Sequence, residues 1–142
     1  MRLWHQDLIH YLPRQQLLGQ HRECAALRGL GWKKKHSVVD YVFKHPINDL
    51  FAYHSIVMKE MEDRGYHVNE VWKDSRYRGK SIGIADGIPQ SSPFWKDNKH
   101  VYAEHDKAYL DECLANLKRK NAKLVNGKTI DNFLEKEEKT GN

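Results

Sequence analysis

The sequence has only two cysteines and no long apolar run, and these shortages exclude several classes of protein. Cys24 and Cys113 cannot build the disulfide framework that small secreted domains need. Each falls on the apolar side of an expected helix, so we expect two small buried side chains in a reducing compartment. No apolar stretch approaches the ~20 residues that a membrane-spanning helix requires. The first residues also lack a signal peptide's apolar core, so we expect a cytoplasmic protein, associated with the nucleoid if bacterial.

Recognisable motifs for cofactors and metals are also lacking. The stretch GIADGIP, residues 83–89, has no Lys-Ser/Thr ending of the kind that a phosphate-binding loop carries. Nine histidines are present, but none stands at a zinc-like pair spacing with a cysteine partner. His54 falls on the apolar face of an expected helix, which favours a hydrogen-bonded core imidazole over a ligand. We therefore expect no metal and no organic cofactor.

Positive charge is what the sequence has in excess. Lysine and arginine number 24 against 19 acidic residues, which gives a formal net charge of +5 and a pI near 9.1. This balance favours a polyanionic partner without identifying one. A chain of 142 residues suits one domain, which can bury about two-thirds of its unfolded surface. We expect a monomer.

Hydrophobic periodicity predicts an all-α fold, a single compact helical domain with a long ordered loop between its second and third main helices. Pro13 and Pro46 suit helix starts, and Gly29, Gly31 and Gly65 suit helix ends. The helices are expected at residues 13–29, 46–64, 104–120 and, as a short fourth, 130–136.

The rest of the chain is expected to lack regular structure. Residues 68–101 hold most of the turn-forming residues and are expected to form the long loop. SVVDYVF, residues 37–43, reads as a short strand or an extended link. The helical domain is predicted to span residues 1–121, and residues 122–142 a polar C-terminal tail.

The first expected helix places one carboxylate, Glu23, on the face turned away from the core. At 100° per residue, Gly19, Glu23 and Ala26 share this face, while Cys24 and the leucines cluster on the opposite one. Small residues beside an acid leave room for another molecule to approach it. Spacing alone nevertheless favours an ordinary solvated glutamate over a functional one.

A family resemblance changes that balance. The segment QQLLGQHRE, residues 15–23, fits a Gln-His-Leu-x-x-x-Tyr-Arg-Glu motif, with Gln16 in place of the His and His21 in place of the Tyr. Three later segments follow in order: NDLFAYHSIVMKEMEDRGYHV, which ends in Arg-Gly-aromatic, then YRGKSIG, and then YAEHDKAYLDECLANL, in which a His stands beside an acid. Together, over about residues 1–120, they resemble the pyrimidine-dimer DNA glycosylase family of the phage endonuclease V type.

The resemblance implies a DNA repair enzyme that acts on pyrimidine dimers or related damaged and abasic sites in double-stranded DNA. The family uses an N-terminal α-amine that forms a Schiff base to the sugar and then cuts the strand as an AP lyase. By resemblance, the Met1 amine is the nucleophile, and Glu23 stabilises charge and accepts a proton. Arg2, Arg22 and Arg28 would bind phosphate or orient the sugar.

Two further stretches interleave basic and aromatic residues: GWKKKHS, residues 31–37, and VWKDSRYRGK, residues 71–80. Such loops can hold phosphates and stack on unpaired bases, although Trp32 and Trp72 can equally anchor the core. With the first helix and the chain start, they supply the DNA-binding residues that we predict: Arg2, Arg14, Gln15, Arg22, Arg28, Lys33, Lys34, Lys35, Arg76, Arg78 and Lys80.

Two other functions fit the sequence. One is a non-catalytic nucleic-acid-binding module on the same scaffold, which Arg2 at the second position and Gln16 in place of the family's His both favour. The other is a small helical interaction protein whose positive charge is incidental.

Overall fold

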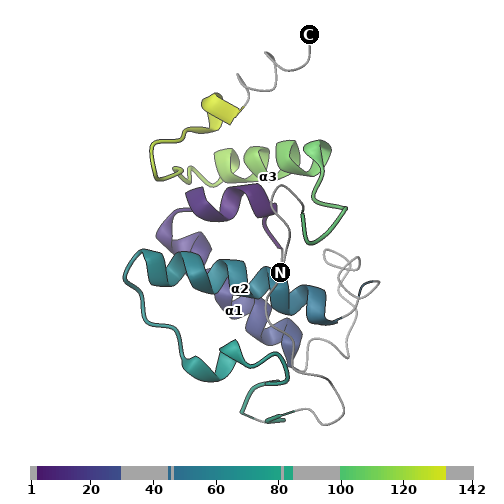
Figure 1. Cartoon of the computed structure of the whole chain (residues 1–142). Helices are drawn as coiled ribbons and strands as arrows, with labels where there is room; N and C mark the ends of the chain where they lie inside the picture. Colours follow the sequence, from purple (N-terminus) through teal and green to yellow (C-terminus); the bar gives the residue numbers. More distant parts are fainter. Residues whose placement is uncertain (1–2, 30–44, 46, 81, 85–99, 134–142) are drawn as a thin grey trace.

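Helices dominate the computed structural model, which describes residues 3–29, 45, 47–80, 82–84 and 100–133 (Figure 1). The elements are η1 (Gln6–Tyr11), α1 (Arg14–Arg28), α2 (Ile47–Asp63), η4 (Glu70–Lys73) and α3 (Lys107–Arg119), where η marks a 3-10 helix. Within these ranges, β pairing is limited to an isolated antiparallel bridge between Tyr77 and Ile84. The prediction of an all-α fold is confirmed. No helix in the described ranges has the length and apolar character that crossing a bilayer demands.

Helix α1 begins after Pro13 and ends at Gly29, as the sequence predicts. Proline suits the residue before the first turn because no helical hydrogen bond needs its missing N–H. The Gly29 N–H closes the helix by donating to the carbonyls of Ala25 and Ala26, both at 3.2 Å. A Cβ on Gly29 would stand only 2.9 Å from the Arg78 carbonyl oxygen. Glycine therefore allows a loop from much later in the chain to pass against the end of α1.

Helix α2 packs against α1 and supplies the centre of the core. Its predicted apolar seam is buried, with Leu50, Val57 and Met61 at most 3% exposed. Beyond the helix, Gly65 adopts a φ of 87°, a left-handed conformation that glycine adopts without a steric penalty. The Tyr66 N–H then bonds back to the Met61 carbonyl at 2.9 Å. The link predicted at residues 37–43 lies outside the described residues.

Helix α3 is shorter than predicted because a side-chain cap fixes its start. The Asp106 carboxylate accepts the Tyr109 backbone N–H at 2.9 Å, so the helix begins at Lys107. Cys113 on this helix and Cys24 on α1 are buried, as predicted, and no disulfide joins them. Burial raises the pKa of the Cys24 thiol, which makes it an unreactive core residue.

Element η1 lies between α2 and α3 (Figure 1). Leu8, Ile9 and Leu12 from this segment are at most 1% exposed in the shared core. The described part of the predicted C-terminal tail packs on the same segment: the Val125 N–H donates to the Tyr11 carbonyl at 2.8 Å. Helical structure is present over residues 130–133, while the rest of the predicted fourth helix lies outside the described residues.

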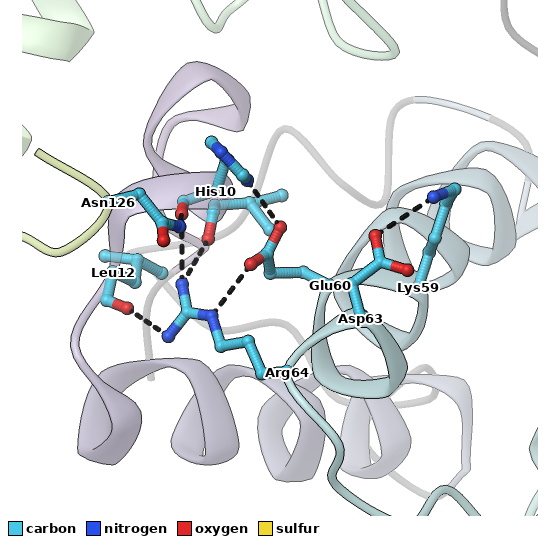
Figure 2. Close-up of polar contacts among 8 residues, drawn as sticks. His10, Leu12, Lys59, Glu60, Asp63, Arg64 and Asn126 are labelled. Carbon is cyan, nitrogen blue, oxygen red and sulfur yellow. Dashed lines mark hydrogen bonds and ion pairs between the residues drawn. The ribbon is translucent and has the colours of Figure 1, made fainter.

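A polar cluster holds the end of η1 on α2 (Figure 2). Arg64 donates to the Leu12 carbonyl at 2.7 Å and to the His10 carbonyl at 3.1 Å, and these are the orphan acceptors at the end of a helix. Its Nε donates to Glu60 at 2.7 Å, and Glu60 also lies 2.7 Å from the His10 ring. The guanidinium thus acts as the C-terminal cap of the first helical segment.

Candidate active site

Helix α1 presents Glu23 among small residues, as its periodicity predicts. Glu23 and Gly19 are half-buried, and Ala26 and Arg22 are exposed. A Cβ built on Gly19 would have Arg22 Nη2 as its nearest neighbour, at 3.8 Å, so the guanidinium lies back over the glycine. A carboxylate and a cation therefore share one accessible face of the helix.

The buried amide of Gln20 joins Glu23 to the start of the chain. Its Nε2 donates to Glu23 Oε2 at 3.2 Å, and its Oε1 accepts the Trp4 backbone N–H at 2.5 Å. The Tyr53 hydroxyl, from α2, lies 2.9 Å from the same Oε1. Because both ends of the amide are engaged, its orientation is fixed. Residue 4 is therefore held beside the turn of α1 that carries Glu23.

Two tyrosines clamp the backbone near the chain start. The Tyr53 hydroxyl donates to the Trp4 carbonyl, and the Tyr109 hydroxyl of α3 donates to the Leu3 carbonyl at 2.5 Å. Leu3 and Trp4 are both buried. Met1, the predicted nucleophile, lies outside the described residues. The two clamps fix the first described residues of the chain against α2 and α3.

Arg28 occupies the interior, so the expectation that it binds DNA phosphate is corrected. Its side chain is fully buried. The guanidinium donates to the carbonyls of Trp72, Asp74 and Tyr77 at 2.8, 2.6 and 3.2 Å and lies 5.0 Å from the Trp72 ring centroid. Burial lowers the pKa of Arg28 to about 10, which leaves it charged at neutral pH. Arg28 shapes the basic segment 72–80 without reaching the surface.

A hydrogen-bonded chain of side chains runs from Arg28 to His21 on α1. Arg28 Nη1 lies 2.9 Å from His54 Nδ1, and because arginine can only donate, this ring nitrogen accepts. The His54 Nε2–H then donates to His21 Nδ1 at 2.8 Å. Burial, followed by Arg28, lowers the pKa of His54 well below its ordinary value. His54 is thus the hydrogen-bonded core imidazole that the sequence predicts.

The other predicted DNA-binding residues divide by exposure. Arg78 is only 6% exposed and donates to the Ser75 carbonyl at 2.6 Å, so its expected phosphate contact is corrected as for Arg28. Arg76 is half-buried, and its hydrogen bonds lower the pKa of Asp74 to about 2. The exposed members are Arg14, Gln15, Arg22 and Lys80. Outside the described residues lie Arg2, Lys33, Lys34 and Lys35.

Sequence reasoning missed residues that act through long-range contacts. Gln20, Tyr53 and Tyr109 have no motif of their own, and only the folded chain shows which backbone groups they bind. The structure also brings together ligand atoms of His5, Asp7 and His100, all within 4.8 Å of one another. The expectation of no metal rests on spacing along the chain, which cannot show such a grouping.

A comparison with protein-family models matches residues 1–74 to a family described as pyrimidine dimer DNA glycosylase. The match covers slightly more than half of the 142 residues. It includes η1, α1 and α2, and hence the bonds from Trp4 through Gln20 to Glu23. Comparisons with curated proteins and with solved structures gave no match.

Proposed function

Since the chain belongs to the pyrimidine dimer DNA glycosylase family, we propose that it releases damaged pyrimidines from double-stranded DNA and then cuts the strand at the abasic site. Membership supports glycosylase activity on pyrimidine dimers. Our finer proposal is that the Met1 α-amine forms a Schiff base with the sugar and that the enzyme is also an AP lyase.

One observation carries this proposal: Gln20 bonds both to the Trp4 backbone N–H and to the Glu23 carboxylate. A Schiff-base mechanism needs the chain-terminal nitrogen and an acid close to the same sugar. The Gln20 amide holds a residue near the chain start against the turn that carries the acid. This link supports the proposal, because a positioned amine and acid would turn a slow bimolecular encounter into a reaction between groups already in place.

The proposed chemistry follows from the two groups. An α-amine has a pKa of about 7.7–8.0, so a usable fraction is neutral and nucleophilic near neutral pH. Its nitrogen bonds to C1′ while the glycosidic bond breaks, and that electron pair leaves on the base. One amine proton neutralises the departing base, and the second passes to O4′ as the sugar ring opens, which leaves an imine between the nitrogen and C1′.

Glu23 has two roles in this proposal. Its carboxylate faces the positive charge that develops on the sugar, where a fixed anion lowers the barrier. It then accepts a proton from C2′, and elimination breaks the C3′–O bond so that the 3′ phosphate leaves. An enzyme reaches a glycosidic bond in duplex DNA by distorting the double helix and extruding a nucleotide. We propose that the exposed face of α1, which carries Glu23, contacts the lesion.

Phosphate binding is proposed for the exposed cations. Arg14, Arg22 and Lys80 lie at the surface, and Arg22 stands beside Glu23 on α1. Cations that neutralise phosphates release counterions, so DNA affinity should fall steeply with salt. The basic residues outside the described ranges, Arg2 and Lys33–Lys35, are proposed as further contacts.

Strand cleavage of ultraviolet-irradiated plasmid tests the proposed activity. Wild-type protein should nick irradiated but not unirradiated plasmid without added metal. Glu23→Gln should reduce nicking by about 10²–10³-fold, because it removes the charge opposite the developing cation. Glu70→Gln, at an exposed glutamate on η4, is the matched control and should nick normally.

Three results would count against this function. Nicking by Glu23→Gln at the wild-type rate would remove Glu23 from the mechanism. Salt-sensitive DNA binding with no nicking by the wild-type chain would identify the nucleic-acid-binding module instead. A chain with no DNA affinity even at low salt would leave only the helical interaction protein.

A further inference from the structure

A second group of chemically capable side chains lies at the other end of the N-terminal segment. His5 precedes η1, Asp7 lies in its first turn, and His100 comes from the far part of the sequence. His100 Nε2 is 2.8 Å from Asp7 Oδ1, and His5 Nδ1 is 3.9 Å from Asp7 Oδ2. The His5 and His100 rings meet edge to face, with centroids 5.1 Å apart. Two imidazole rings and one carboxylate thus place their ligand atoms within 4.8 Å of one another.

This donor set suits a divalent transition cation. Imidazole nitrogen and carboxylate oxygen are common ligands of Zn²⁺ and related ions in sites with three protein ligands, where a water completes the tetrahedral shell. Metal–ligand bonds of about 2.0–2.1 Å place the donors of a tetrahedral site about 3.3 Å apart. The distance from His100 Nε2 to Asp7 Oδ1 is 2.8 Å and that from His5 Nδ1 to Asp7 Oδ2 is 3.9 Å, and the ligand atoms of all three residues lie within 4.8 Å of one another. Small shifts of the exposed Asp7 and His100 side chains would open the site to a cation.

The buried ligand is already held in place. The His5 side chain is 2% exposed, and its ring stacks on the His105 ring at 5.4 Å. His105 in turn stacks on Tyr109 of α3 at 5.2 Å and accepts the Gln6 backbone N–H at 3.1 Å. Rings fixed in this way lose little freedom when a ligand bond forms, and such outer contacts orient metal-binding histidines.

Metal binding through His5 Nδ1 would break one existing hydrogen bond. The Asp7 backbone N–H donates to His5 Nδ1 at 3.0 Å and caps the first turn of η1. Coordination through this nitrogen takes over its lone pair and releases the Asp7 N–H. Metal binding is therefore coupled to the start of η1.

We propose that His5, Asp7 and His100 form a binding site for a divalent cation of the zinc type, which ties the segment before α3 to the start of the chain. The site goes beyond the proposed repair activity and does not depend on it. His100 lies beyond the residues that match the family, so the site belongs to this chain and is not a property of the matched region.

Titration of the metal-free full-length chain with Zn²⁺, in competition with a chromophoric chelator, tests the proposal. The wild-type protein should bind one equivalent, and Co²⁺ in its place should give the visible absorption bands of a low-coordinate site. Asp7→Asn and His100→Gln, both at exposed positions, should each weaken Zn²⁺ binding at least tenfold without changing the circular dichroism spectrum. His67→Gln replaces another exposed histidine and should bind Zn²⁺ as the wild type does.

Two results would overturn the site. The first is the absence of saturable one-to-one binding by the wild-type chain at micromolar protein concentration, which would leave an ordinary hydrogen-bonded pair between His100 and Asp7. The second is saturable binding that neither Asp7→Asn nor His100→Gln weakens, which would place the cation elsewhere. Because the readout is metal affinity, failure here would leave the proposed DNA repair activity untouched.

Discussion

Gln20 is the single residue that most directly connects the fold to the proposed chemistry. It is buried, and its amide serves the Trp4 backbone on one side and Glu23 on the other. The Tyr53 hydroxyl donates to the Trp4 carbonyl and lies 2.9 Å from the same amide oxygen, whereas Gln20 Nε2 donates to the Glu23 carboxylate. Replacing Gln20 removes the bond to Glu23, whereas replacing Tyr53 leaves that bond in place. Comparing the two variants therefore tests whether this bond matters for cleavage.

We predict that Gln20→Leu lowers the free energy of unfolding by about 1–3 kcal/mol, since it leaves the Trp4 N–H without its acceptor. It should reduce cleavage of abasic DNA at least tenfold more than it reduces DNA binding. Tyr53→Phe should cost a similar stability but leave cleavage within a few-fold of wild type. Urea unfolding, a binding titration and single-turnover cleavage measure the three quantities. Equal losses of cleavage in both variants would show that Gln20 acts only through stability.

Residue type alone misleads at Arg28. Arginine normally occupies the surface, and the first helix has other arginines that do lie there. Arg28 instead follows Cys24 by one turn, on the core face, and its acceptors are backbone carbonyls 44 to 49 residues further along the chain. No local pattern shows such partners. The position of Glu23 beside Gly19 and Ala26, by contrast, follows from helical periodicity, which depends only on near neighbours.

At the scale of elements, the sequence predicts best where local chemistry decides. Pro13 and Gly29 bound α1, and the apolar seam of α2 is buried as its spacing indicates. The observed start of α3 lies three residues after the predicted one, because the Asp106 side chain caps the helix there. The short elements η1 and η4 have no periodic signal in the sequence, since segments of six and four residues are too short to give one.

Arg64, directly after α2, donates to the Leu12 and His10 carbonyls at the end of η1 (Figure 2). Arg64→Met should lower the free energy of unfolding by about 2–4 kcal/mol, because it removes the guanidinium from the buried Glu60 carboxylate and the donor from the Leu12 carbonyl, which follows η1. The matched control is Lys59→Met on the same helix, which breaks an exposed pair with Asp63. It should cost less than about 1 kcal/mol. Urea denaturation compares the two, and equal costs would show that Arg64 is not a cap.

At the scale of the whole molecule, buried histidines couple folding to pH. Burial is the main cause that lowers the pKa of His54 well below 6.5 and that of His105 to about 3. In the unfolded chain the pKa of each histidine returns to about 6.5. At a pH between the folded and unfolded pKa values, the unfolded chain therefore binds more protons than the folded chain. Stability is therefore fully present above about pH 6.5 and is lost as the pH falls.

The resulting prediction is a steep acid destabilisation. Each of these two groups can contribute about 1.4 kcal/mol per pH unit once the pH is well below 6.5. The urea midpoint should be constant from pH 8 to 7 and then fall continuously toward pH 5. His105→Gln should reduce the slope if the variant folds, and His67→Gln, at an exposed site, should not. A midpoint that does not change down to pH 5 would show that these rings are not held neutral in the folded state.

The most direct test of the proposed function is the position of a trapped adduct. The full-length chain is incubated with a duplex that contains one abasic site, sodium borohydride reduces any imine, and mass spectrometry locates the modified residue. The intact mass also shows whether Met1 begins the mature chain. We predict one covalent adduct, on the α-amine of Met1. An adduct on a lysine side chain, or no adduct from a protein that binds the duplex, would contradict it.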